Sequence, residues 1–190
     1  IRKMQILKLD SIPHLSVRDD SDHEIIKMIN SYRKVGVTTI LALRGDAPSG
    51  YGAGETKNAA YLVRLIREEF GDDLRVLVAA YPEIHPESET LDIDIAFFKE
   101  KVEAGADSAI TQFFYNPDAY DNFLSEIDKK DICVPIIPGV MPIQNVDGLI
   151  RMSKQCKAEI PRWLEYSLKN RQEDLQKFAI ELVTGLCNRL

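Results

Sequence analysis

Polar side chains that could bind a ligand or move a proton recur at the ends of short apolar runs in this sequence. Imidazole, guanidinium, carboxylate and amide groups occupy these positions. Such groups donate or accept hydrogen bonds and can carry charge to a substrate. The positions are His14, Arg44-Gly45-Asp46, Tyr81-Pro82-Glu83-Ile84-His85-Pro86 and Gln112.

Several of these residues also have an ordinary structural interpretation. A histidine within an apolar strand, such as His14, is often a satisfied core residue, and His85 could be an exposed loop residue. Gln112 could simply cap the end of a strand. Asp94 and Lys101 lie seven residues apart on one helix face, which is typical of solvated surface. Two histidines without a third ligand at suitable spacing predict no metal site.

The Arg44-Gly45-Asp46 segment favours a functional interpretation, although a structural arginine–aspartate pair remains open. Glycine lets the backbone approach a ligand closely. Arg44 could bind a phosphate or a carbonyl with parallel hydrogen bonds. Asp46 would place a fixed negative charge beside a reacting group.

The segments that must position these residues alternate between strand and helix patterns. Apolar, β-branched runs predict strands at residues 12–17, 37–43, 74–80, 108–114 and 133–137. Ser21 and Glu24 predict a capping box at the start of the first helix, which Gly36 ends. Further helices are predicted at residues 56–70, 90–104, 117–128 and 145–155, near Trp163, and at 172–189.

This order predicts an α/β protein with a parallel sheet and right-handed crossovers. An open doubly wound sheet and a (β/α)8 TIM barrel both fit it. Neither GxGxxG nor GxxxxGK[ST] follows a predicted strand, which disfavours the Rossmann and P-loop folds. We therefore favour a barrel, incomplete in this chain, of about five to six βα units. Residues 1–190 are interpreted as a single catalytic barrel domain, truncated at both ends.

Composition restricts the class of protein further. The 190 residues carry a net charge of −6 and are 45% hydrophobic, which excludes wholesale disorder. The acidic balance disfavours nucleic acid and anionic membranes as partners. Three widely spaced cysteines, with Cys133 expected to be a buried thiol, predict a reducing, cytoplasmic location.

The motifs together resemble the methylenetetrahydrofolate reductases. The similar segments are Pro13–Leu15, Leu41–Asp46, Ala80–Glu87, Lys101–Ala106, Ile110–Phe114 and Ile137–Ile143, in family order. The resemblance implies a (β/α)8 barrel with non-covalent FAD at its C-terminal mouth. It implies reduction of 5,10-methylenetetrahydrofolate to 5-methyltetrahydrofolate by NADH or NADPH. The kinetics would be ping-pong, with the nicotinamide and the folate using the same place in turn.

The resemblance also assigns roles residue by residue. Asp46 and Gln112 match folate-contacting positions, with Gln112 expected to bond to the pterin and the Asp46 charge expected to act catalytically between pterin and flavin. Lys101 would neutralise phosphate. Asn58 departs from the family pattern, in which a tyrosine commonly precedes the alanine. The FAD-binding positions are His14, Arg44, Gly45, Asp46, Asn58, Ala59, Tyr81, His85, Pro86, Glu87, Ser88, Asp94 and Lys101.

Two alternatives remain open. The family's general-acid glutamate, near the end of its first strand, has no counterpart in these residues. The chain could therefore be a non-catalytic flavin-binding fragment or regulatory subunit whose barrel a partner chain completes. An unrelated barrel lyase or aldolase would need a Schiff-base lysine within a strand, and none of the five predicted strand cores contains one. Small-molecule substrates and a homo-oligomer are the expected partners.

Overall fold

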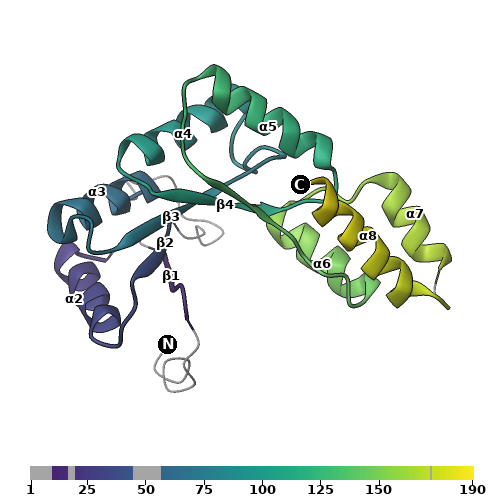
Figure 1. The fold of residues 1–190 in the computed structure, drawn as a ribbon, viewed down its shortest axis with the longest axis horizontal. Coiled ribbons are helices and arrows are strands. Elements are labelled where there is room, and N and C mark those ends of the chain that lie inside the picture. The colour runs from purple at the N-terminus through teal and green to yellow at the C-terminus, as the bar shows by residue number, and fades with distance from the viewer. Residues whose placement is uncertain (1–9, 17–19, 45–56, 172) are drawn as a thin grey trace. The chain divides into compact units, whose positions relative to one another are not determined.

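The computed structural model describes residues 10–16, 20–44, 57–171 and 173–190. Strands and helices alternate along these residues (Figure 1). The strands are β1 (His14–Ser16), β2 (Thr39–Leu43), β3 (Arg75–Ala80), β4 (Ser108–Phe113) and β5 (Ile136–Gly139). The helices are α2 (Asp22–Arg33), α3 (Ala59–Phe70), α4 (Leu91–Glu103), α5 (Pro117–Lys129), α6 (Val146–Cys156), α7 (Arg162–Asn170) and α8 (Leu175–Arg189).

The strands form one sheet in the order β1-β2-β3-β4-β5. Parallel pairing sets His14 opposite Leu41 in β1 and β2, and Leu41 opposite Leu77 in β2 and β3. Sequential strands joined through helices and paired in parallel are the βα units that the sequence predicts. The carboxyl ends of such strands point to one edge of the sheet, where α/β folds bind their ligands.

The chain divides into two compact units, which are described separately. In the first, comprising residues 1–79 and 96–109, α2 and α3 lie beside the first three strands (Figure 1). Ile25 and Ile29 of α2, Leu62 and Ile66 of α3, and Ile40 of β2 are fully buried. The predicted capping box is present at the start of α2. Burial of these apolar faces, more than helix propensity, therefore holds the helices in place.

Arg67 joins the loops at the amino ends of the strands in this unit. Its guanidinium donates to the carbonyl oxygens of Gly105 and Leu74, each at 2.8 Å, and to the Asp107 carboxylate at 2.6 Å. The same Asp107 oxygen accepts the Val76 backbone N–H at 2.6 Å. Polar residues at this end of the strands thus serve structure.

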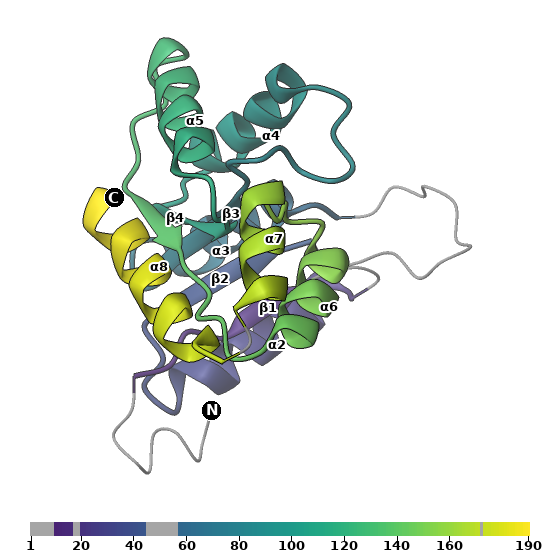
Figure 2. The same ribbon diagram turned by 90° about the vertical axis from the view of Figure 1, so that its right-hand side faces the viewer.

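The second unit comprises residues 80–95 and 110–190, in which α6, α7 and α8 lie side by side (Figure 2). Phe113, Tyr115, Leu164 and Leu168 belong to its main apolar cluster. The Tyr115 hydroxyl donates to the Met141 carbonyl at 3.0 Å, and burial raises the pKa of Tyr115 to about 12. The Tyr115 hydroxyl is therefore a structural donor over the physiological pH range.

Two chain segments come unusually close where β5 ends in this unit. The Gly139 N–H donates to the Thr111 hydroxyl at 2.8 Å. A Cβ atom built on Gly139 would collide with the Thr111 carbonyl oxygen. Glycine is required here because of this close backbone approach.

The last predicted strand is displaced in the structure. β5 begins at Ile136 and ends at Gly139, whereas residues 133–137 were expected. Pro135 explains the later start, because proline donates no backbone hydrogen bond and restricts the residue before it. Cys133 accordingly lies outside the strand and is exposed, so the expectation of a buried thiol is wrong. Cys133, Cys156 and Cys187 are all free thiols.

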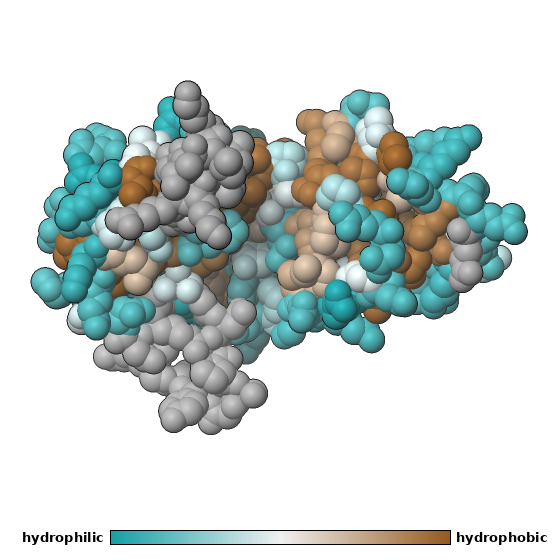
Figure 3. Space-filling model, turned by 90° about the horizontal axis from the view of Figure 1, so that it is seen from below, coloured by the Kyte–Doolittle hydropathy of each residue, from teal (hydrophilic) through white to brown (hydrophobic). Residues whose placement is uncertain are grey.

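Apolar side chains also remain at the surface of the helical part of the second unit. Figure 3 shows apolar surface over the α6–α8 region. Trp163 and Tyr166 of α7 are 53% and 72% exposed, and Ile180 of α8 is 61% exposed. Within the described ranges, no helix combines the length and the apolar character that crossing a bilayer requires.

Candidate functional site

A short loop after β3 carries much of the predicted site, and Asp94 holds it in place. The Asp94 carboxylate accepts the His85 backbone N–H at 2.9 Å and the Ser88 hydroxyl at 3.3 Å. Asp94 is only 8% exposed, although it lies in the first turns of α4. The expectation of a solvated surface is therefore wrong for Asp94. Its carboxylate instead holds the loop by accepting these two hydrogen bonds.

The ring of His85 has a defined orientation within this loop. It meets the Tyr81 ring edge to face, with 4.5 Å between ring centroids and 82° between planes. Its Nδ1 atom accepts the Glu87 backbone N–H at 3.1 Å. Because Nδ1 accepts this bond, Nε2 is the ring nitrogen that can donate. His85 is half-buried, so it is not the exposed loop residue that was the alternative.

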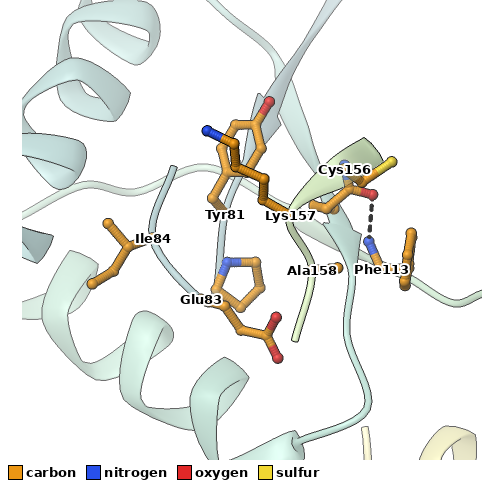
Figure 4. A pocket seen from close by; sticks show the side chains of 9 residues that line it. Tyr81, Glu83, Ile84, Phe113, Cys156, Lys157 and Ala158 are labelled. Carbon is orange, nitrogen blue, oxygen red and sulfur yellow. Dashed lines mark hydrogen bonds between the residues drawn. The ribbon is translucent and has the colours of Figure 1, made fainter. Parts of the chain in front are cut away.

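Tyr81 and Gln112 line one pocket of the second unit (Figure 4). The pocket is small, with space for about one water molecule. The Gln112 Oε1 atom accepts the Phe113 N–H at 3.0 Å, so its amide nitrogen is the group oriented to donate to a ligand. The complete lining is Tyr81, Pro82, Glu83, Ile84, Gln112, Phe113, Cys156, Lys157 and Ala158.

Glu83 is a site residue to which the sequence reasoning gave no role. Its Oε2 atom accepts the Glu159 backbone N–H at 2.8 Å. Its Oε1 atom is buried and has no hydrogen-bond partner among the residues that the structure describes. Burial raises the pKa of Glu83, and the bond from Glu159 opposes that rise. The only signal in the sequence was its place two residues after Tyr81.

Lys101 belongs to the first unit, where it reaches the carboxyl end of β3. Its Nζ atom donates to the Ala79 carbonyl at 2.6 Å and lies 5.4 Å from the centre of the Phe98 ring. Lys101 is half-buried, so the expectation of a solvated surface is wrong for it as well. An ammonium group held at a strand end adds positive charge where α/β folds bind anions.

The start of α3 is fixed by a polar cluster that the sequence reasoning missed. Lys57 Nζ donates to the Asp22 carboxylate at 2.6 Å and to the Asp20 carbonyl at 2.7 Å, and the Tyr61 hydroxyl donates to the same carboxylate oxygen at 2.6 Å. Bonding to Lys57 lowers the pKa of Asp22. Asn58 is the N-cap of α3, because its Oδ1 accepts the Tyr61 N–H at 2.8 Å.

The remaining predicted residues of the first unit lie at or next to strand and helix ends. His14 is the first residue of β1 and is exposed, so it is not a buried core histidine. Arg44 directly follows β2 and is half-buried, and Ala59 is the first residue of α3. Gly45 and Asp46 lie outside the described residues.

The structure thus brings several predicted residues together within the second unit. They are Tyr81, His85, Glu87, Ser88, Asp94 and Gln112. Pro86 and Glu87 are exposed in the same loop. In the portion of the chain that the structure covers, no three side chains are arranged to hold a metal ion.

The strand order and the alternating helices are features of an α/β barrel, and comparison with known proteins gives the family. The family model described as methylenetetrahydrofolate reductase matches residues 2–190. The chain therefore belongs to the methylenetetrahydrofolate reductase family.

Curated relatives agree with this assignment. A probable methylenetetrahydrofolate reductase (NADH) of Oryza sativa subsp. japonica is 34% identical, over 100% of this chain and 35% of the relative. The 5,10-methylenetetrahydrofolate reductase of Escherichia coli (strain K12) is 36% identical, over 88% of this chain and 56% of the relative. A probable methylenetetrahydrofolate reductase (NADPH) of Caenorhabditis elegans is 32% identical, over 96% of this chain and 28% of the relative. The chain thus spans between about a quarter and about half of these relatives.

Solved structures show the fold. An uncharacterized protein from Clostridium thermocellum, which binds two copies of 5-methyl-5,6,7,8-tetrahydrofolic acid, has a TM-score of 0.56 at 19% identity. The likeness covers 100% of this chain and 86% of that one. A phosphonopyruvate hydrolase has a TM-score of 0.53 at 14% identity, and the likeness covers 99% of this chain and 73% of that one. The fold is that of a (β/α)8 barrel, incomplete in this chain, which confirms the sequence prediction.

Proposed function

We propose that this chain is the catalytic barrel of a methylenetetrahydrofolate reductase. It reduces 5,10-methylenetetrahydrofolate to 5-methyltetrahydrofolate with NADH or NADPH, through FAD, in two half-reactions of a ping-pong cycle. Family membership over nearly the whole chain supports the reaction. The observation that carries the site is that Asp94 fixes the loop of His85, while Tyr81 and Gln112 line one pocket.

The residues present fit FAD. The Tyr81 and His85 rings pack edge to face, and Nε2 is the His85 ring nitrogen that can donate a hydrogen bond. Lys101 holds a cation at the end of β3 that suits a diphosphate. FAD, when bound, supplies the hydride-transfer chemistry.

The chain's own residues orient the substrates. The Gln112 amide donates to the pterin, because its oxygen is already engaged by Phe113. Asp46 contributes negative charge between the pterin and the cofactor. Arg44, directly after the carboxyl end of β2, and His14, the first residue of β1, bind the cofactor. Asp94 and Asn58 act by holding the loop and capping α3 in the positions that the cofactor requires.

The nicotinamide donor is NADH or NADPH, and curated relatives carry both names. We further propose that the two units are parts of one barrel domain, that the protein is cytoplasmic, and that it forms a homo-oligomer. Its partners are then small molecules rather than nucleic acid or membrane.

The folate half-reaction tests this function at Gln112. FAD-loaded Gln112→Ala protein, first reduced by NADH or NADPH, should be reoxidised by methylenetetrahydrofolate at least about tenfold more slowly than wild type, while retaining FAD. Gln176→Ala, which alters an exposed residue of α8, is the matched control. Reoxidation of Gln112→Ala at the wild-type rate would contradict the proposed folate site. Wild-type protein that holds FAD without turnover would favour the flavin-binding fragment instead.

A further inference from the structure

The buried carboxylate oxygen of Glu83 is the starting point. Buried polar atoms are nearly always hydrogen-bonded, and leaving one unsatisfied costs free energy. Glu83 Oε2 is satisfied by the Glu159 N–H, but Oε1 has no partner within the described part of the chain. The geometry of this pocket therefore includes an acceptor that lacks a donor.

Lys157 does not supply that donor. It lines the same pocket, but Figure 4 shows its amine beside the Tyr81 ring and the Glu83 carboxylate on the other side of the pocket. The space in the pocket suits about one water-sized group. An exocyclic amino group on the edge of a larger ligand has this size.

Gln112 gives the pocket a complementary donor. Because its Oε1 bonds to Phe113, its amide nitrogen is the group presented to a ligand, whereas Glu83 presents an acceptor. A ligand that bonds to both residues must carry an acceptor and an N–H donor. The 2-amino-4-oxo-pyrimidine edge of a pterin has this pattern.

We propose that Glu83 is a folate-binding residue that accepts a hydrogen bond from the 2-amino group of the pterin, beside Gln112. This inference rests on the proposed function and extends it to a residue that selects the substrate. The raised pKa of Glu83, which follows from its burial, agrees with an acceptor that lacks a donor in the ligand-free protein.

A matched pair of ligands and two variants test the proposal. The ligands are 5-methyltetrahydrofolate and its analogue with a methyl group in place of the 2-amino group. The variants are Glu83→Gln, whose amide oxygen can still accept from Glu159, and Glu83→Ala. Dissociation constants of both ligands and of FAD are measured on FAD-loaded protein by equilibrium dialysis. Glu159→Gln is the control, because it alters a nearby carboxylate and leaves the backbone N–H that Glu83 accepts.

Wild type should bind the 2-amino ligand about 10–100-fold more tightly than the methyl analogue, as expected for a hydrogen bond to a charged group. Glu83→Gln should reduce this preference by about tenfold and leave the FAD dissociation constant unchanged, and Glu159→Gln should keep the wild-type preference.

Three results would overturn the proposal. Glu83→Gln could keep the full preference for the 2-amino ligand while Glu83→Ala weakens the binding of FAD and of both folates equally. Glu83 would then have only a structural role, through its bond to the Glu159 N–H. If wild type binds FAD but has equal affinity for the two folate ligands, the pocket does not recognise the 2-amino group. If wild type binds neither FAD nor folate, the proposed function itself has failed.

Discussion

Asp94 fixes the loop that follows β3 with a single buried side chain. Its two oxygens bond to the His85 N–H and the Ser88 hydroxyl, and it is almost fully buried. A carboxylate acceptor strengthens both bonds relative to a neutral one. The family resemblance places Asp94 at the flavin, which stays a prediction, whereas the structure shows Asp94 bonded to the loop after β3.

Asp94→Ala should lower the free energy of unfolding by about 2–3 kcal/mol, because a buried N–H loses its acceptor. Asp94→Asn should lose less, since its amide oxygen can still accept one of the two bonds. Urea denaturation measures both changes, and FAD affinity should fall in the same order. Wild-type stability in Asp94→Ala would show that the loop does not depend on this carboxylate.

Glu83 makes stability depend on pH in a defined direction. Burial raises its pKa above the ordinary value of 4.5, and the nearby Glu159 charge adds to the rise. The folded protein therefore holds this proton more tightly than the unfolded chain does. The resulting stability is present below pH 4.5 and is lost as pH rises through the raised pKa.

Glu83→Gln cannot titrate, so its stability relative to wild type should increase between about pH 4 and pH 7. Urea denaturation at both pH values measures the change, with Lys157 and Glu159 left intact as the charged neighbours. Exposed Glu69→Gln is the control. A relative stability that stays constant with pH, or falls, would contradict the burial of the Glu83 carboxyl group.

At the level of elements, the approach of β5 to β4 makes Gly139 irreplaceable. Gly139→Ala places a methyl group against the Thr111 carbonyl oxygen and should destabilise the protein by about 1–3 kcal/mol. Gly185→Ala in α8 meets no atom within 4 Å and should stabilise it by about 0.5–1 kcal/mol. Urea denaturation of the two variants should give opposite signs. Equal effects would mean that the two backbones are not in close contact.

Asn58 has two possible roles that substitution can separate. As the N-cap of α3, Asn58→Ala should cost about 0.5–2 kcal/mol, whereas Asn58→Ser should keep the cap. We expect Asn58→Ser to retain stability and to bind FAD more weakly, because the resemblance also places this residue at the cofactor. Denaturation and FAD titration measure the two effects. Wild-type FAD affinity in Asn58→Ser would leave capping as its only role.

Local sequence signals predicted most elements, because their causes are local. The capping box of Ser21 and Glu24 and the end of the helix predicted at residues 56–70 depend on neighbouring residues, and both appear as expected. β5 is displaced because of Pro135. The apolar pattern of residues 133–137 predicts a strand but does not show where the proline makes it begin. The bond between Glu83 and Glu159 joins residues 76 positions apart, so no local pattern could predict it. The burial of Asp94 and Lys101 likewise depends on tertiary contacts.

For the whole molecule, we propose that a barrel of this family holds FAD and transfers reducing equivalents to the folate. The sheet order, the family match and the solved structures agree on the barrel. The single-domain interpretation of residues 1–190 stays a prediction, as does the assignment of Gly45 and Asp46.

Asp46→Asn tests the charge assigned to that position. FAD should remain bound, while the rate of the folate half-reaction changes by about 10–1000-fold, because a charge next to the reacting groups is removed. Stopped-flow measurement of each half-reaction separates the two effects. Wild-type rates in both half-reactions would count against the assigned role.

Binding of FAD is tested by the visible absorption of the protein after incubation with FAD and removal of free cofactor. We predict that the protein is yellow, that NADH or NADPH bleaches it without oxygen, and that methylenetetrahydrofolate restores the colour. Folded protein that stays colourless with added FAD would contradict the proposal that this barrel is a flavoprotein.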